Sequence, residues 1–202
     1  MVEVIDCEQN TQEWLEARLG VPTASAFHRA LAKGRGDAMS VTAKKYAYEL
    51  AAQLVTEMLP EQWGNADTER GHEHEPVARE LYEQKTGSKV EQVGFIKNGV
   101  AGYSPDGLVG DDGLVEFKSK KPELHLECLL EQSIPSEHMK QLYGGLWVSG
   151  RQWIDFVSYC PNLPLCIKRV ERDEKAIAEI EHGIKRFNDG VQDVYNRIIE
   201  AY

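Results

Sequence analysis

The sequence predicts an α/β or α+β protein, with a mixed central β-sheet flanked by helices. Three observations carry this prediction. Apolar residues recur at helical spacing between about residues 10 and 86. Period-two alternation broken by turn residues replaces that spacing over residues 88–120. A helix, two more strands and a long charged helix follow, and we expect all 202 residues to form a single domain.

The first part of the chain carries the signals of three helices. Residues 10–20 open on residues that cap helices and close on a glycine, and a second short helix is expected over 21–34. A long amphipathic helix is expected from Ser40 to about Leu59, where Pro60 stops it. Its apolar positions are Ala43, Tyr46, Ala47, Leu50, Ala51, Leu54, Val55 and Met58.

A fourth helix and a set of hairpins come next. The helix is expected over 68–86, with an inward face of Val77, Ala78, Leu81 and Tyr82. Asn98-Gly99 within alternating residues predicts a hairpin, and residues 111–113, "DDG", predict a second turn. The stretch "LVEFKSK", residues 114–120, is the next strand.

The last part of the chain alternates between helix and strand. Helices are expected over 123–132, 136–150 and 173–202, and strands over 152–160 and 165–171. The inner face of the helix over 136–150 should comprise Met139, Leu142, Leu146 and Trp147. Core or interface positions are expected for Trp63, Trp147 and Trp153.

Composition limits the function. The four cysteines are scattered without a CxxC pair, so we expect free thiols and a reducing compartment. Without a signal peptide or a run of roughly eighteen apolar residues, a cytoplasmic protein with no membrane partner is expected. The formal net charge of −10 opposes nucleic-acid binding by the whole molecule, although lysines and arginines cluster over 33–45 and 118–121.

Two acids and a lysine point to a reaction. Side chains alternate along a strand, so Glu116 and Lys118 should face one side while Phe117 faces the other. The turn over 111–113 can bring Asp106 beside them. Paired carboxylates suit Mg²⁺ or Mn²⁺, and a neighbouring lysine can orient the water that attacks a phosphodiester.

A plainer interpretation exists for any single match of this kind. Asp106 then only forms a turn, and Glu116 and Lys118 are a solvent-facing strand pair. The context favours the functional interpretation, because "SPDG" before one strand and "VEFK" in the next match the PD-(D/E)xK nuclease signature.

With these residues in place, the chain resembles the lambda exonuclease, or YqaJ-type viral recombinase, family of alkaline exonucleases. The resemblance extends to three further motifs, covering most of residues 10–160: "WLEARLGVPTAS" from Trp14, "GHEHEPVAR" from Gly71 and "HMKQLYGGLWVSG" from His138. It implies a restriction-endonuclease-like fold.

The resemblance also implies roles for individual residues. Asp106 and Glu116 would bind Mg²⁺, with Mn²⁺ as a substitute, together with the carbonyl of Phe117, and Glu75 would support a second ion. Lys118 would position the attacking water. Gln141 would hydrogen-bond near that water, with Tyr143 as a neighbour.

Phosphate groups would be held by Arg18, Ser25 and Ser104. The family prototype has an arginine downstream of its lysine that grips the terminal phosphate. Here the stretch reads "SKKPELHLE", so Lys120, Lys121 or His125 would have to replace it.

The implied activity is digestion of linear double-stranded DNA from its 5′ ends, leaving a 3′ single strand for phage-type recombination. The resemblance further implies a homotrimeric ring, a single-strand annealing protein as partner, and a phage or prophage gene in a bacterial host. Two alternatives are a RecB-like or restriction-like endonuclease on the same core and a non-catalytic protein that binds DNA ends.

Overall fold

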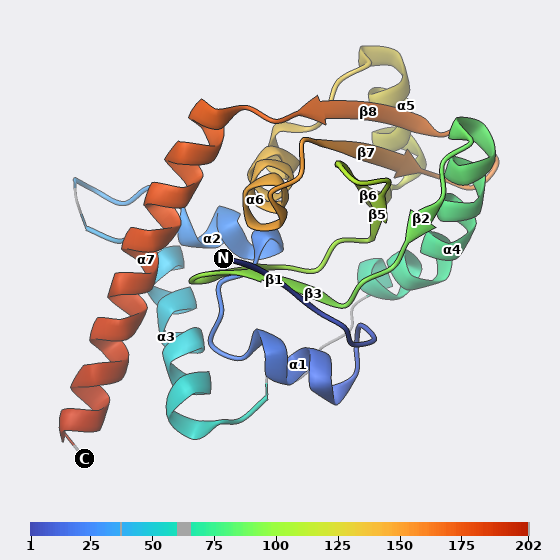
Figure 1. The fold of residues 1–202 in the computed structure, drawn as a ribbon. Coiled ribbons are helices and arrows are strands. Elements are labelled where there is room, and N and C mark those ends of the chain that lie inside the picture. Colours follow the sequence, from blue (N-terminus) through green and yellow to red (C-terminus); the bar gives the residue numbers. More distant parts are fainter. Residues whose placement is uncertain (37, 60–65, 202) are drawn as a thin grey trace.

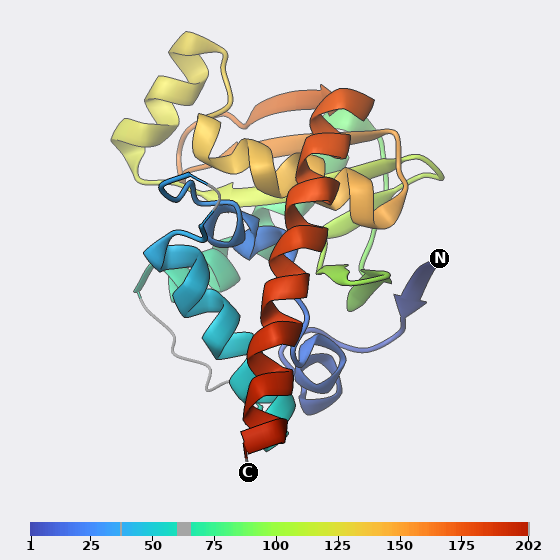
Figure 2. The ribbon, with the colours of Figure 1, turned by 90° about the vertical axis from the view of Figure 1, so that its left-hand side faces the viewer.

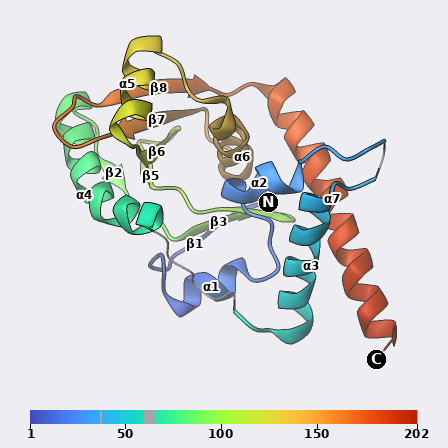
Figure 3. The same cartoon turned by 180° about the vertical axis from the view of Figure 1, so that it is seen from behind.

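The computed structural model describes residues 1–36, 38–59 and 66–201. Two β-sheets lie at its centre, and helices pack around them (Figure 1). The C-terminal helix α7 (Glu174–Ala201) lies beside α3 (Val41–Thr56) at one end of the molecule, and α4 (Ala66–Thr86) lies at the other end (Figures 1 and 3). The expected class, a mixed sheet flanked by helices, is confirmed.

The larger sheet is mixed. Its strand order is β2 (Val90–Glu91), β5 (Gly107–Val109), β6 (Gly113–Ser119), β7 (Trp153–Tyr159) and β8 (Cys166–Glu171). Strands β6 and β7 run parallel, whereas the other neighbouring pairs are antiparallel.

The smaller sheet is antiparallel. Strand β3 (Phe95–Asn98) pairs with β4 (Ala101–Tyr103) on one side and with β1 (Val2–Ile5) on the other. Strand β1 is not predicted from the sequence, because so short a strand at a chain end is recognisable only through its partner.

Both expected hairpin turns are present. Asn98 pairs with Ala101, so the loop between β3 and β4 is two residues long, and Gly99 within it has a φ of 58°. Glycine adopts this left-handed conformation without steric cost. Val109 pairs with Gly113 across the second turn. The short loop over 110–112 fixes the register of β5 on β6 and thereby the position of Asp106.

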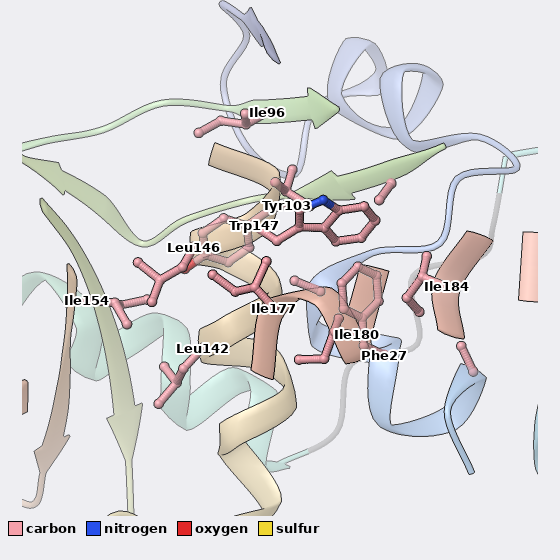
Figure 4. Packing of buried hydrophobic residues seen from close by; sticks show 14 of the residues in the cluster. Phe27, Ile96, Tyr103, Leu142, Leu146, Trp147, Ile154, Ile177, Ile180 and Ile184 are labelled. Atoms are coloured by element: carbon pink, nitrogen blue, oxygen red, sulfur yellow. The ribbon is translucent and has the colours of Figure 1, made fainter. Parts of the chain in front are cut away.

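The chain crosses from β6 to β7 through α5 (Pro122–Glu131), a 3₁₀ turn (Ser136–His138) and α6 (Met139–Ser149). A parallel pair needs such a crossover, since a tight turn cannot join strands that run in the same direction. The predicted inner face of α6 is confirmed. Leu142, Leu146 and Trp147 are buried in the cluster that also holds Ile154 of β7 and Ile177 and Ile180 of α7 (Figure 4). Met139 is partly buried and packs against this cluster.

Helices α6 and α4 cover opposite faces of the larger sheet. Leu114 of β6 belongs to the hydrophobic cluster around α6, whereas Phe117 packs with Tyr82 of α4. Because side chains alternate along β6, Glu116 and Lys118 share the α6 face with Leu114.

The N-terminal helices agree only in part with expectation. Helix α1 (Gln12–Arg18) is capped by Thr11, and α3 is capped by Ser40 but ends at Thr56, earlier than expected. Helix α3 packs along α7, which also contacts α6 (Figure 2). The predicted stop at Pro60 lies outside the described residues, as does Trp63.

The single helix expected over 21–34 is wrong. Thr23 instead forms a parallel bridge with Gly102, and Gly102 N–H donates to the Pro22 carbonyl at 3.0 Å. This pairing holds the backbone extended, so only a 3₁₀ turn (Ala24–Ala26) and the short helix α2 (Phe27–Ala30) follow.

The predicted inward face of α4 is half right. Ala78 and Tyr82 are buried, but Val77 and Leu81 are 44% and 38% exposed. Each helical residue advances by about 100°, so these two stand beside the stripe that meets the sheet rather than on it.

The cysteines and two of the tryptophans have the environments that the sequence predicts. The four cysteines are free thiols. Trp147 is buried in the core, and Trp153 is partly buried. Within the part of the chain that the structure describes, no helix is both long and apolar enough to span a membrane.

Candidate active site

Strand β6 and the turn before β5 form the centre of the site. The register that pairs Gly107 with Val115 carries Asp106 to a position beside Glu116. The Phe117 N–H donates to Asp106 Oδ2 at 2.6 Å. The Phe117 ring points away and meets the Tyr82 ring of α4 edge-on, with centroids 5.9 Å apart. The predicted alternation along this strand is therefore present.

Glu116 is the most heavily hydrogen-bonded acid of the site, with only 2% of its surface exposed. Its Oε1 accepts from Lys118 Nζ at 2.7 Å and from Gln141 Nε2 at 2.5 Å. Its Oε2 accepts from the Tyr103 hydroxyl at 2.7 Å. Three donors from β4, β6 and α6 thus hold this carboxylate in one orientation.

The charges of the site are not balanced. Burial raises the pKa of Asp106 well above its ordinary value, and the nearby carboxylates of Glu116 and Glu75 raise it further, against the opposing effects of Lys118 and the Phe117 N–H. Burial lowers the pKa of Lys118, but the three acids raise it by more. The Lys118 ammonium therefore lies among three carboxyl groups, of which that of Glu75 is also paired with Arg79.

Glu75 approaches from the other side, on α4. It pairs with Arg79 one helical turn later, as the plain i,i+4 interpretation expects. It also lines a cavity of about 250 Å³ together with Asp106, Phe117 and Lys118. Among the residues that the structure describes, the buried Arg79 Nε has no hydrogen-bond partner.

The donor chemistry fits a hard divalent cation. Carboxylate oxygens and a backbone carbonyl are the ligands that Mg²⁺ and Mn²⁺ prefer, and a cation would offset the excess negative charge beside Asp106. Over residues 1–36, 38–59 and 66–201, no three His, Cys, Asp or Glu side chains are arranged to hold one ion by themselves. The expected ligand set is of another kind, because it combines two carboxylates with the backbone carbonyl of Phe117.

Two of the expected phosphate-binding residues lie together. Arg18 Nη1 donates to Ser104 Oγ at 2.8 Å, and its guanidinium lies 4.0 Å from the centre of the Trp14 ring. The Trp14 Nε1 also donates to Ser104 Oγ, at 2.8 Å. Burial lowers the pKa of Arg18 to about 10, so it stays charged at neutral pH. No carboxylate among the described residues forms an ion pair with it.

Ser25 lies on the α6 side of the centre. It lines a second cavity, of about 580 Å³, together with Lys118 and Gln141. Lys118 therefore borders both cavities, between α4 and α6. Tyr143, expected as a neighbour of Gln141, packs against the hydrophobic core.

Three residues could replace the arginine that grips the terminal phosphate in the family prototype, and they differ in their exposure and contacts. His125 is fully buried, with its ring nitrogens 2.7 Å from Ser158 Oγ and 3.0 Å from the Pro164 carbonyl, so its proposed role is wrong. Lys121 is exposed at the start of α5. Lys120 lies 2.7 Å from His138 Nε2, with 11% of its side chain exposed.

Sequence reasoning missed two residues that contact the site. Tyr103 carries no motif signal, although it stands on the short strand that leads into "SPDG". Trp14 belongs to the quoted motif "WLEAR", but nothing in the sequence shows that its indole N–H reaches Ser104.

Comparison with known proteins shows the family and the fold of the chain. A family model described as the YqaJ-like viral recombinase domain matches residues 13–152. The fold is similar to crystal structures of LHK-Exo, an alkaline exonuclease from Laribacter hongkongensis, one of them in complex with dAMP, with a TM-score of 0.85 and 36% identity over 95% of this chain and 97% of theirs.

A phage-related exonuclease from Haemophilus somnus 129PT shares the fold, with a TM-score of 0.69 and 17% identity over 90% of this chain and 96% of that one. No curated protein sequence matches the chain. The expected restriction-endonuclease-like fold is confirmed by these structures.

Proposed function

Because the chain belongs to the YqaJ-like viral recombinase domain family, we propose that it is a metal-dependent exonuclease that digests one strand of linear double-stranded DNA from the 5′ end. The observation that carries this proposal is the position of Asp106 and Glu116 beside Lys118. The likeness to an alkaline exonuclease of 36% identity supports a phage-type exonuclease.

Asp106, Glu116 and the Phe117 carbonyl would hold Mg²⁺, or Mn²⁺ in its place, with Glu75 supporting a second ion. When bound, the cation would stabilise the negative charge that develops on the phosphate being cut. Arg18, Ser25 and Ser104, with Lys120 and Lys121, would hold the DNA phosphates.

The side chains of the protein have separate tasks in this reaction. Lys118, which borders both cavities, would orient the attacking water with an ammonium hydrogen that Glu116 does not accept. Gln141 and Tyr103 would keep Glu116 in place, since both donate to its carboxylate. Fixing these groups before the substrate arrives lowers the cost of reaching the reactive geometry.

The finer features of the proposal come from family membership. The product would be a duplex with a 3′ single-stranded overhang, used in recombination by a single-strand annealing protein in the cytoplasm of a bacterial host. A homotrimeric ring around the DNA would reconcile the net charge of −10 with a polyanionic substrate, because basic residues would line the channel. The dAMP complex of the related structure is consistent with nucleoside monophosphate products.

The test is an assay on linear duplex DNA with 5′-phosphates and Mg²⁺. We expect the parent to shorten one strand from each 5′ end and to leave circular plasmid intact. Lys118→Ala should lower the rate by about 100-fold or more, the scale of a lost proton-transfer or orienting group. Lys89→Ala removes an exposed lysine that is not among the residues lining either cavity, and it serves as the matched control.

Three results would contradict the proposal. Equal activity of Lys118→Ala and the parent would remove the lysine from the mechanism. Cleavage of circular plasmid would favour the endonuclease alternative. Tight binding of duplex ends without any metal-dependent product would favour the non-catalytic alternative.

A further inference from the structure

A long hairpin runs through both β-sheets. Its first arm is β2 followed by β3, and its second arm is β4 followed by β5. Glu91 of the first arm faces Leu108 of the second in the larger sheet. Five residues further along the first arm and five residues back along the second, Ile96 faces Tyr103 in the smaller sheet. The two sheets therefore share one register, and an interruption in the pairing divides them.

The interruption covers residues 92–94 in the first arm and 104–106 in the second. Among the described residues, no backbone hydrogen bond joins these two segments. Pro105 contributes to the interruption, because proline has no N–H to donate to a neighbouring strand. Asp106 lies at the end of the second segment, so the chain that leads into this residue is not held by the pairing of either sheet.

The Gln9 side chain bridges the interruption. Its Nε2 donates to the Val93 carbonyl at 3.0 Å and to the Pro105 carbonyl at 2.8 Å. An amide nitrogen carries two hydrogens, so this one group can satisfy a carbonyl in each arm. The Gln9 amide thus joins the two arms at the place where their backbones do not bond to each other.

Two neighbouring contacts keep Gln9 in this place. A Cβ on Gly94 would lie 2.1 Å from the Cys7 carbonyl oxygen, so glycine allows the chain around Cys7 to lie directly against the first arm. The Trp14 Nε1 also spans the interruption, donating to the Gly94 carbonyl at 3.1 Å and to Ser104 Oγ at 2.8 Å. The chain on either side of Gln9 is therefore fixed to the same two segments.

The bridge acts on the peptide group that precedes Asp106. Because a peptide group is planar, a fixed Pro105 oxygen sets the direction in which the chain enters Asp106. After Asp106 the chain is held by the pairing of β5 with β6, and the Asp106 carboxylate itself accepts from the Phe117 N–H. Gln9 therefore supplies the restraint on the one side of Asp106 that the sheets leave free.

We propose that Gln9 is a positioning residue for the metal centre, whose amide bridge keeps Asp106 in the orientation in which it binds the divalent cation. The proposal rests on the proposed function, because it takes Asp106 as a metal ligand. In this role Gln9 acts through the Pro105 carbonyl and not by contact with the cation. Without the bridge, the segment that carries Asp106 can shift relative to Glu116, and cation binding weakens.

The first measurement is the dissociation constant for Mn²⁺, obtained without DNA from the electron paramagnetic resonance signal of the free ion. Gln9→Met keeps the length of the side chain but removes both donors, and Gln9→Glu places a carboxylate against two carbonyls. Gln12→Met is the matched control, because Gln12 is exposed on α1 and donates to the exposed Glu16. Ile184→Val, in the buried part of α7, is a control that lowers stability away from the site.

We expect the Mn²⁺ dissociation constant to rise about tenfold in Gln9→Met and at least as much in Gln9→Glu, the loss that follows when a group orienting a metal ligand is removed. Gln12→Met and Ile184→Val should bind Mn²⁺ like the parent. In the nuclease assay, excess Mg²⁺ should restore most of the rate of Gln9→Met, because the bridge acts on cation binding.

The second measurement needs neither metal nor DNA. Hydrogen exchange of the Phe117 amide, followed by NMR in the metal-free protein, reports whether Asp106 still accepts from it. We expect this amide to exchange about tenfold faster in Gln9→Met, relative to the other amides of β6. Ile184→Val should instead speed the exchange of these amides together.

Two results would overturn the proposal. One is equal Mn²⁺ affinity of Gln9→Met and the parent, and the other is an equal loss of affinity in Ile184→Val, because weaker binding would then follow from lower stability alone. If the parent binds no Mn²⁺ and degrades no DNA, the proposed function fails instead. The exchange of the Phe117 amide then decides the bridge, because faster exchange in Gln9→Met supports it and unchanged exchange contradicts it.

Discussion

At the scale of single residues, the site is built from charges that are buried together. The cost of burying the Glu116 side chain is offset because Tyr103, Lys118 and Gln141 all donate hydrogen bonds to it. Alternation along one strand predicts the Glu116 and Lys118 pair from the sequence alone. The role of Tyr103 is not predictable in this way, since a strand of three residues has no periodicity to show which neighbour its hydroxyl meets.

The titration of His138 makes the stability of the folded protein depend on pH. Its pKa is about 4 in the folded protein, because burial, Lys120 and Lys118 disfavour the charged ring while Glu137 opposes them weakly. The unfolded chain has the ordinary value near 6.5 and binds the proton first, so stability falls as pH drops from about 6.5 toward 4.

Urea unfolding at pH 7 and pH 5 measures this dependence. The parent should lose about 2 kcal/mol more than His138→Phe over that interval. Equal losses in the two proteins would show that His138 titrates normally in the fold.

At the scale of elements, helices and strands with strong periodicity were predictable, and exact extents were not. The helix expected over 21–34 fails because the partner of Thr23 is Gly102, far away in the sequence. The inward face of α4 is half right because hydrophobicity does not tell Val77 from Ala78. The close approach of α6 to β4 depends on Gly145, and its approach to Phe27 of α2 depends on Gly144. The helical pattern does not reveal the importance of either glycine.

Gly145 of α6 tests this close approach. A Cβ on this residue would lie 2.8 Å from the Tyr103 ring, which is 1% exposed and cannot move aside. Gly145→Ala should destabilise the protein by about 1–3 kcal/mol in urea unfolding, since overpacking outweighs the gain in helix propensity.

Gly71→Ala is the matched control for that substitution. It lies within α4, and a Cβ there meets no atom within 4 Å. Its effect should be neutral or stabilising by up to about 1 kcal/mol. A stability loss in Gly71→Ala as large as that in Gly145→Ala would contradict the packing argument.

At the scale of the whole molecule, fold class and family followed from the order of several motifs, each weak by itself. Oligomeric state cannot be derived in the same way, because the features that join copies of a chain need no local motif. The oligomeric state bears on DNA binding, because the net charge of one chain is −10. An acidic chain is attracted to DNA only where its basic residues are gathered on one surface.

Sedimentation equilibrium measures the mass directly. We expect three times the mass of one chain at micromolar concentration, as the proposed ring requires. A monomer across the accessible concentration range would remove the ring and leave the charge of the molecule without that explanation.

The central claim is that Asp106 and Glu116 share a divalent cation next to Lys118. Anomalous diffraction from crystals grown with Mn²⁺ tests it most directly. We expect a manganese peak within coordination distance of both carboxylates and the Phe117 carbonyl, and its loss in Asp106→Asn. A saturated crystal with no peak at this position, or with an unchanged peak in Asp106→Asn, would contradict it.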